Sequence, residues 1–401
     1  MKKLHLNSLC VLILFLTAFV GNLPSYAAPV VPDYRINENG IWTKDTSVPQ
    51  FRKSPVSSRL SSDDTSALLM FTGDLMCLAG QQFSAERRSS FNFDSSFGYV
   101  EKLFNSADFV CGNLESLISS SNPLTKQQKN IGSAPQCNGP EEYLWALRKA
   151  GFDCLVTANN HCCDWGTSGI SETEKMLDKY HFAHVGTSSS IESNYVLFDI
   201  KDFRIAILST THIINQRGKL NADEMYSMVS CYDKERVIHD IADARLNGAD
   251  FVVVYCHWGT ENTEELTSVQ KDSALEVAEA GADLIIGSHP HCLQGKEILT
   301  TSDGRSVPVM YSMGNFVSSM ARDINNDTII LNVRISRNSD DKSYIEAINY
   351  IPCHVMNSAT YGNLCVVPTE PVFNNASASA SLQAAEKRIR RIIGSFDFPF
   401  I

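Results

Sequence analysis

Short apolar runs recur along the middle of the chain, and segments with helical periodicity separate them. The runs contain many β-branched residues and little polar alternation, which is typical of strands covered on both faces. They occupy residues 67–73, 107–112, 152–158, 204–210, 250–257, 282–288 and 307–313. Because such strands alternate with helices, the pattern predicts an α/β domain with a layered sheet.

Four intervening segments have the residue spacing of helices. They span residues 140–151, 168–180, 233–248 and 267–281. Gly151, Gly248 and Gly281 stand at the ends of three of them, where glycine commonly terminates a helix. In the remaining segment, Ser171 and Glu174 have the spacing of a capping box, which is a signature of a helix start.

The pattern changes beyond about Asp323. Residues 327–336 and 343–355 predict a pair of strands, and residues 382–394 predict an amphipathic helix. We therefore expect residues 323–401 to complete or cap the preceding α/β domain.

The N-terminus has the features of a secretory signal peptide. Residues 1–27 combine a basic start, an apolar run and small residues, which predicts cleavage after Ala27. The apolar run is short for a membrane span, which favours cleavage over an uncleaved anchor. Residues 28–66 are rich in Pro and Ser and lack periodicity, so they predict a linker before a domain at residues 67–322. We expect a secreted or cell-surface protein without a transmembrane segment after cleavage.

Composition narrows the function further. The chain of 401 residues is 43% hydrophobic and 20% charged, which is typical of a globular protein. Its formal net charge of -11 and lack of a long basic run argue against nucleic acid as a partner. Of the 12 cysteines, Cys10 falls in the signal segment, so the mature chain holds an odd number and cannot pair them all.

Polar side chains follow six of the predicted strands at their C-terminal ends. In open α/β sheets, ligands bind at that edge. The residues at these positions are Asp74, Asn113, Glu115, Asn159, Asn160, His161, His257, Ser288, His289, His291 and Asn315. Any one of them could be an ordinary turn or cap residue. Coincidence at six strands is a weaker explanation than a shared site.

The residue types at this edge indicate a metal. Imidazoles, carboxylates and an amide oxygen suit divalent Mn, Fe or Zn. His289 and His291 flank Pro290, and residues two apart in an extended segment share a face, so both could address one ion or two neighbouring ions. A buried structural pair is the alternative. His161 directly follows Asn160, which would place it just outside the metal, where a general acid could meet a leaving group.

Two features of the same loop remain open at this point. Asp164 could orient His161, or it could cap a helix that starts near Thr167. Cys162 and Cys163 resemble half of a zinc knuckle, but no matching cysteine pair is present. We interpret these two cysteines as packing residues or a vicinal pair.

The strand-end motifs also carry a family resemblance. They read TGDLM, GNLE, TANNHCCDWG, HWGTE, AGADLIIGSHPHCLQG and VMYSMGNF. In order and spacing, from about Leu68 to Val317, the chain resembles the CapA family of poly-γ-glutamate capsule biosynthesis proteins. That family is similar to calcineurin-like metallophosphoesterases. The resemblance implies a four-layer α/β/β/α sandwich that holds one or two divalent ions.

The resemblance also implies roles for individual residues. Metal-facing positions are Asp74, Asn160, His257, His289 and His291, to which we add Glu115. His161, with Asp164 beside it, is the expected catalytic acid. We expect Asn113, Glu261 and Asn315 to contact the substrate.

The motifs depart from the phosphoesterase pattern at two positions. Those enzymes usually begin with Asp-x-His, whereas Met76 stands at the third position here. Their second motif is Gly-Asp, whereas Asn113 stands here in place of the aspartate. The site therefore holds one ion, or two if Glu115 substitutes for a missing ligand.

Two functions of different class follow. The first is a secreted metal-dependent hydrolase that acts on a phosphoester or an amide in the cell envelope, which the metal-type residues favour. The second is a non-catalytic component that binds an anionic polymer or the capsule synthesis machinery. The altered motifs and the family's association with polymer assembly favour the second.

Overall fold

The computed structural model describes residues 34–36, 39–44, 66–128, 135–191, 193–357, 364–374 and 379–396. The chain divides into two units, Met1–Val31 and Pro32–Ile401, and the description below concerns the second. The predicted signal peptide and most of the predicted linker lie outside the described residues.

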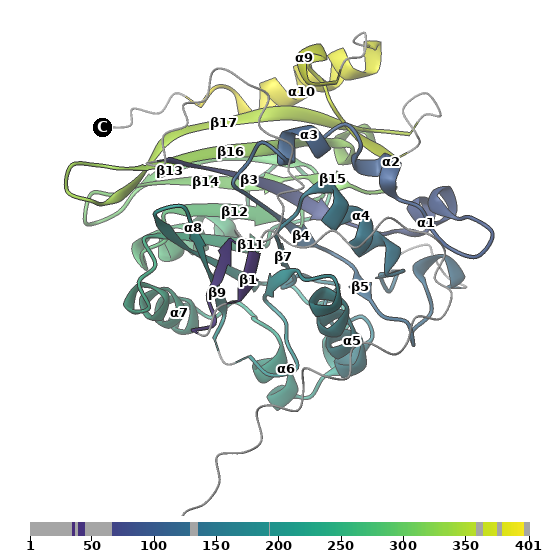
Figure 1. Ribbon diagram of the computed structural model, residues 1–401, viewed down its shortest axis with the longest axis horizontal. Coiled ribbons are helices and arrows are strands. Elements are labelled where there is room, and N and C mark those ends of the chain that lie inside the picture. Colours follow the sequence, from purple (N-terminus) through teal and green to yellow (C-terminus); the bar gives the residue numbers. More distant parts are fainter. Residues whose placement is uncertain are drawn as a thin grey trace, which may run out of the picture. The chain divides into compact units, whose positions relative to one another are not determined.

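Two large sheets form the centre of this unit (Figure 1). The first contains, in spatial order, β1 (Tyr34–Ile36), β2 (Trp42–Lys44), β9 (Tyr195–Ile200), β10 (Phe203–Thr211), β11 (Phe251–His257), β12 (Leu284–Ser288), β14 (Ser306–Met313) and β13 (Leu293–Thr300). Strands β10, β11, β12 and β14 are parallel, whereas β9 and β13 run antiparallel to β10 and β14.

The second sheet has a similar mixed character. It contains, in spatial order, β18 (Cys365–Pro368), β17 (Ser343–Met356), β16 (Asp327–Arg337), β3 (Ser66–Leu75), β4 (Phe109–Leu114), β7 (Cys154–Val156) and β8 (Ala183–Val185). Strand β15 (Asn315–Val317) pairs in parallel with β3. Strands β3, β4, β7 and β8 are parallel, and β16 to β18 are antiparallel. A separate pair consists of β5 (Leu117–Ile118) and β6 (Asn138–Gly139).

Helices lie between these strands and after them. They are α1 (Ala79–Ala85), α2 (Asp94–Phe97), α3 (Glu101–Phe104), α4 (Glu142–Ala150), α5 (Gly166–Lys179), α6 (Ala222–Met228), α7 (Lys234–Leu246), α8 (Ser268–Glu279), α9 (Pro371–Asn374) and α10 (Ala380–Ile393). Short 3-10 turns lie at Thr125–Gln127, Arg217–Lys219 and Asp323–Asn325. None of the helices in the described ranges is long and apolar enough to cross a bilayer.

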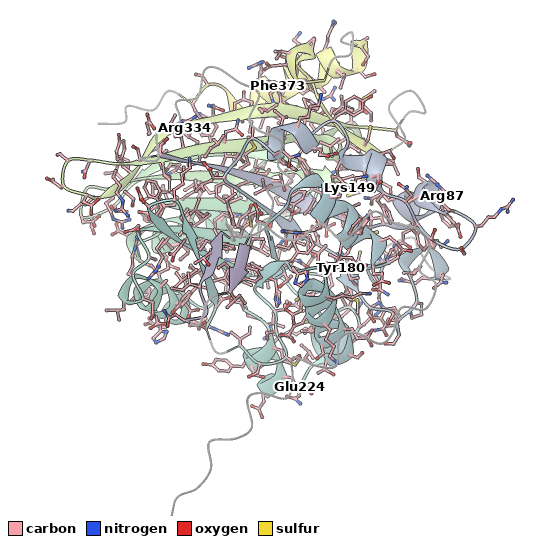
Figure 2. All side chains as sticks on the ribbon, in the orientation of Figure 1. Arg87, Lys149, Tyr180, Glu224, Arg334 and Phe373 are labelled. Atoms are coloured by element: carbon pink, nitrogen blue, oxygen red, sulfur yellow. The ribbon has the colours of Figure 1, made fainter. Side chains whose placement is uncertain are left out.

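Three apolar cores separate four layers. One core lies between the first sheet and helices α7 and α8, a second lies between the two sheets, and a third lies between the second sheet and helices α1 to α5. In the middle core the rings of Phe109 and Phe198 meet across the sheets at 4.6 Å. The outer helices are amphipathic, so Leu144 and Leu147 of α4 are buried, whereas Lys149 is exposed (Figure 2). The predicted four-layer α/β/β/α sandwich is confirmed.

The sequence patterns located most elements correctly. All seven predicted strands and all four intervening helices are present, as are the later strand pair and α10. Ile389 and Ile393 of α10 belong to the core between the sheets, so this helix packs into the domain. The segment predicted as a linker contains the short strands β1 and β2, and β2 pairs with β9 of the domain.

One local prediction also failed. Ser171 and Glu174 lie inside α5, which begins at Gly166 with Trp165 as its N-cap residue. Their side chains instead contact the segment after β8: Glu174 accepts hydrogen bonds from Ser188 and Ser189. The capping-box spacing therefore serves a tertiary contact and not a helix start.

Candidate metal centre

The ends of strands from both sheets converge on one buried cluster. Asp74 lies near the end of β3 and Glu115 follows β4, whereas His257 ends β11 and His289 follows β12. The sheets are joined here directly, because the backbone N–H of His289 donates to Asp74 Oδ2 over 3.2 Å. The shared edge predicted from the strand ends therefore exists in the structure.

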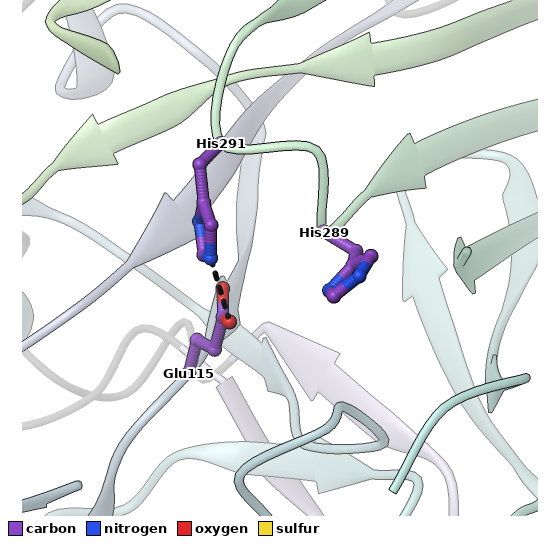
Figure 3. Close-up of side chains that lie close together, drawn as sticks. All are labelled: Glu115, His289 and His291. Atoms are coloured by element: carbon purple, nitrogen blue, oxygen red, sulfur yellow. Dashed lines mark ion pairs between the residues drawn. The ribbon is translucent and has the colours of Figure 1, made fainter. Parts of the chain in front are cut away.

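Glu115 lies at the centre of this cluster without a hydrogen-bond partner. Its Oε1 is 3.7 Å from His291 Nε2 (Figure 3). The same oxygen is 3.9 Å from His257 Nε2, and the side chain of Glu115 is fully buried. Neither carboxylate oxygen has a hydrogen-bond partner among the described residues. Burial, reinforced by the nearby Asp74 carboxylate, raises the pKa of Glu115 well above its ordinary value. A buried orphan carboxylate between imidazoles is an arrangement that a cation would stabilise.

Two of the imidazoles are held in a neutral state. Nδ1 of His257 is 2.9 Å from Ser288 Oγ, and its Nε2 is 3.0 Å from Asn160 Oδ1. Burial and the neighbouring histidines lower the pKa of His257 well below its ordinary value and that of His289 to about 3. Neutral imidazole is the form that binds a metal ion. Nδ1 of His289 is also buried without a partner among the described residues.

His291 is oriented by groups behind it. Its Nδ1 is 2.9 Å from Asn315 Oδ1, and Asn325 Nδ2 donates to its carbonyl oxygen over 2.9 Å. Such contacts leave Nε2 facing Glu115, as outer contacts commonly orient metal-binding histidines. His289 and His291 have φ angles of 97° and 56°, which are uncommon for residues other than glycine. The surrounding contacts hold this strained turn.

The loop after β7 contains a tightly paired histidine. His161 Nδ1 is 2.6 Å from Asp164 Oδ2, and both side chains are buried. Burial alone would lower the pKa of His161, but Cys137 and Asp164 outweigh it and raise the pKa well above its ordinary value. The N-cap residue of α5 makes no side-chain cap hydrogen bond, and Asp164 contacts His161 instead. The capping interpretation of Asp164 was therefore wrong.

The three residues expected at the substrate lie in different environments. Asn113 and Asn315 are buried and hydrogen-bonded within the protein. Asn113 donates to Asp74 Oδ1 over 2.8 Å, and its own oxygen accepts from Asn159 Nδ2 over 3.1 Å. Glu261 is exposed, and none of the hydrogen bonds or ion pairs recorded between described residues involves it. The fold thus brings the two asparagines into the cluster and leaves Glu261 outside it.

Two overlapping sets in this cluster could hold an ion. They are Glu115 with His289 and His291, and Asp74 with Glu115 and His257, and in each set the ligand atoms lie within 4.8 Å of one another. Asn160 lies beside the second set, because its Oδ1 is 3.0 Å from His257 Nε2. The strand-end motifs contained these residues, whereas Asn325, which supports His291, gave no signal in the sequence.

The thiols lie apart from these sets. Cys162 and Cys163 have their sulfurs 3.6 Å apart and pack in an apolar cluster with Leu220 and Met225. All cysteines in the described ranges, 11 in number, are free thiols. The predicted packing role of the vicinal pair agrees with this environment.

Gly259 gives a first testable consequence of this geometry. Its φ is +90°, and a Cβ there would lie 2.8 Å from the side chain of Gln270. We expect Gly259→Val to displace the turn after His257 and lower metal occupancy while the domain stays folded. Elemental analysis and circular dichroism of the purified variant would check this, with Gly295→Val as control, since no atom lies within 4 Å of a Cβ there. Full occupancy in folded Gly259→Val would contradict the expectation.

Comparison with known proteins gives a consistent family signal. A family model described as bacterial capsule synthesis protein PGA_cap matches residues 68–320. The chain is 29% identical over 301 residues to the PGA biosynthesis protein CapA of Bacillus subtilis (strain 168), covering 74% of each protein. It is 28% identical over 321 residues to the capsule biosynthesis protein CapA of Bacillus anthracis, covering 76% of this chain and 71% of that protein. A solved structure, the calcineurin-like phosphoesterase YfkN from Bacillus subtilis, is 13% identical with a TM-score of 0.45, covering 82% of this chain and 97% of that one.

Proposed function

This chain belongs to the family of bacterial capsule synthesis proteins, and we propose that it works there as a metal-dependent hydrolase. We propose that it hydrolyses a phosphoester or an amide in the cell envelope. Export to the cell surface and a poly-γ-glutamate-type anionic polymer as partner belong to the same proposal. The N-terminal apolar run supports export, and the names of the two CapA relatives support the polymer.

The observation that carries the proposal is the orphaned carboxylate of Glu115. A buried carboxylate without hydrogen bonds is costly unless another group compensates it. Burial holds the neighbouring His257 and His289 in the neutral form, so these two imidazoles offer lone pairs and no charge to balance the carboxylate. A divalent cation satisfies the carboxylate and the imidazoles together, and nitrogen and oxygen donors of this kind suit Mn, Fe or Zn.

The residues divide into holding and reacting groups. Asp74, Glu115, Asn160, His257, His289 and His291 would hold the ion. A divalent ion so held supplies Lewis-acid chemistry to the scissile group. His161 then serves as the proton donor. Its Nδ1 is hydrogen-bonded to Asp164, which fixes the orientation of the ring. Its Nε2 is left to donate a proton to the leaving group. The raised pKa keeps this imidazole protonated at neutral pH.

The environment of Asn113 favours a single ion at this cluster. Its amide nitrogen is directed toward Asp74 and its oxygen toward Asn159. In this orientation the side that faces Asp74 is the amide nitrogen, which donates a hydrogen bond and has no lone pair for a second ion there. Met76, at the position where phosphoesterases place a histidine, also offers no imidazole.

The catalytic part of the proposal can be tested at His161. We expect His161→Ala to keep its metal and to lose about 10²–10⁴-fold in turnover, as is typical when a general acid is removed. Elemental analysis and hydrolysis of a set of phosphodiesters and amides by the mature protein would measure both. His239→Ala is the control, since that imidazole is exposed on α7. A loss of Mn²⁺ from His161→Ala loaded with Mn²⁺ alone would contradict the assigned role.

The same experiment separates the two classes of function. If the parent protein holds its ion but hydrolyses none of the substrates, the non-catalytic, polymer-binding function becomes the better explanation. Binding of poly-γ-glutamate to the metal-loaded parent would then be the property to measure.

A further inference from the structure

A third group of potential ligands lies beside the candidate metal centre. It consists of Cys137, His161 and Asp164, whose ligand atoms lie within 4.8 Å of one another. Cys137 and Asp164 are fully buried and His161 is 5% exposed, so none of the three is a solvated surface group. Cys137 comes from the segment before β6, and the other two come from the loop before α5.

Two details indicate that this group is incompletely satisfied. Asp164 Oδ2 accepts from the backbone N–H of Cys137 and pairs with His161 Nδ1, each over 2.6 Å. Its Oδ1, however, is buried without a partner among the described residues. The Cys137 thiol makes a long contact of 3.8 Å with the carbonyl oxygen of Pro135 and also interacts with the His161 side chain. A free carboxylate oxygen, a thiol sulfur and an imidazole therefore share one buried space.

The chemistry of this group differs from that of the centre next to it. Glu115 and its neighbouring ligands offer only oxygen and nitrogen, which many divalent ions accept. Zinc in proteins is bound by thiolate, imidazole and carboxylate ligands, with metal–ligand distances of about 2.0–2.3 Å. A tetrahedral zinc held by these three residues would have a fourth position open.

We propose that Cys137, His161 and Asp164 form a second, zinc-selective metal site next to the main centre. An ion bound there occupies the histidine that otherwise donates a proton, so zinc in excess inhibits hydrolysis. The inhibition rests on the proposed function, whereas the binding site does not. Ions without affinity for thiolate, such as Mn²⁺, fill the main centre and leave this one free.

Cobalt substitution tests the site without any assay of activity. Co²⁺ added to the metal-free mature protein should produce a near-ultraviolet thiolate-to-cobalt charge-transfer band, which added Zn²⁺ removes. Cys137→Ser should abolish that band. Cys163→Ser, which removes another fully buried thiol, should retain it and serves as the matched control. A parent without the band, or a band that survives in Cys137→Ser, would overturn the proposal.

A second measurement protects the result against misfolding of the variant. X-ray absorption at the zinc edge of the parent loaded with excess Zn²⁺ should show sulfur at about 2.3 Å, and a first shell of only oxygen and nitrogen refutes the site. The variant His289→Ala/His291→Ala should keep the thiolate band although its main centre is disabled. A band in a parent that hydrolyses nothing supports the zinc site and refutes only the hydrolase.

Discussion

Replacing both His289 and His291 with alanine is expected to remove most of the bound divalent ion from the main centre. The two imidazoles lie in the turn after β12, and with Glu115 they form one of the two candidate ligand sets of the main centre. Removal of an outer-shell partner alone typically costs about 10–100-fold in metal affinity. Loss of two ligands should exceed this. Elemental analysis after dialysis against a weak chelator, in parallel with the parent, gives the measurement.

The matched control replaces two other buried residues that have metal-binding chemistry. Cys162→Ser/Cys163→Ser should retain the parent's metal content, because these sulfurs pack in a separate apolar cluster. Circular dichroism establishes that both double variants are folded. If the serine variant loses the ion and the alanine variant keeps it, the ligand assignment is wrong.

Glu115→Gln is the second change for which we expect a large effect, with opposite signs in the metal-free and metal-loaded protein. In the metal-free state it replaces a carboxyl group whose pKa is raised by burial with an uncharged amide, so the free energy of unfolding at neutral pH should rise by about 1 kcal/mol. With the metal present, the parent gains stability that the variant lacks. A ligand at 100 times its dissociation constant contributes about 2.7 kcal/mol. Thermal unfolding with and without Mn²⁺ would reveal the crossover.

Glu261→Gln is the control for this substitution. Its side chain is exposed on the loop after β11, so the same change of chemistry there should alter stability by no more than about 0.5 kcal/mol. Metal-dependent stabilisation should also match that of the parent. Equal stabilisation by Mn²⁺ in Glu115→Gln and the parent would show that Glu115 does not bind the ion.

Prediction from the sequence succeeded where local pattern and burial coincide. Strand β11 is buried along its whole length, and the continuous apolar run of residues 250–257 was sufficient to locate it. Strand β13 contains polar residues and is partly or fully exposed beyond Gln294, so its periodicity was weak. The short strands β1 and β2 form through pairing with β9, a contact that no local pattern in the linker region specifies.

The candidate site could also be predicted only in part from the sequence. The positions of Asp74, Glu115 and the histidines at strand ends were enough to predict that they lie together, because the ends of parallel strands share one edge of a sheet. Position could not give the direction in which Asn113 points, since its amide orientation depends on Asp74 and Asn159. Cys137 stands on a loop far from Asp164 in sequence, and only the folded chain places its thiol beside His161.

Each of the two sheets supplies part of the candidate metal centre. A bound ion would therefore hold the two sheets together. Asp74 and Glu115 come from the second sheet, and His257 and His289 from the first. Because only the docked sheets complete the ligand set, each tenfold excess of ion over its dissociation constant adds about 1.4 kcal/mol to their association. The candidate ligand set that is completed first in chain order is Asp74, Glu115 and His257, so a chain that ends before β11 lacks a complete set. Under the proposed function, metal binding would follow the docking of the two sheets, and metal supply would set how firmly they are held together.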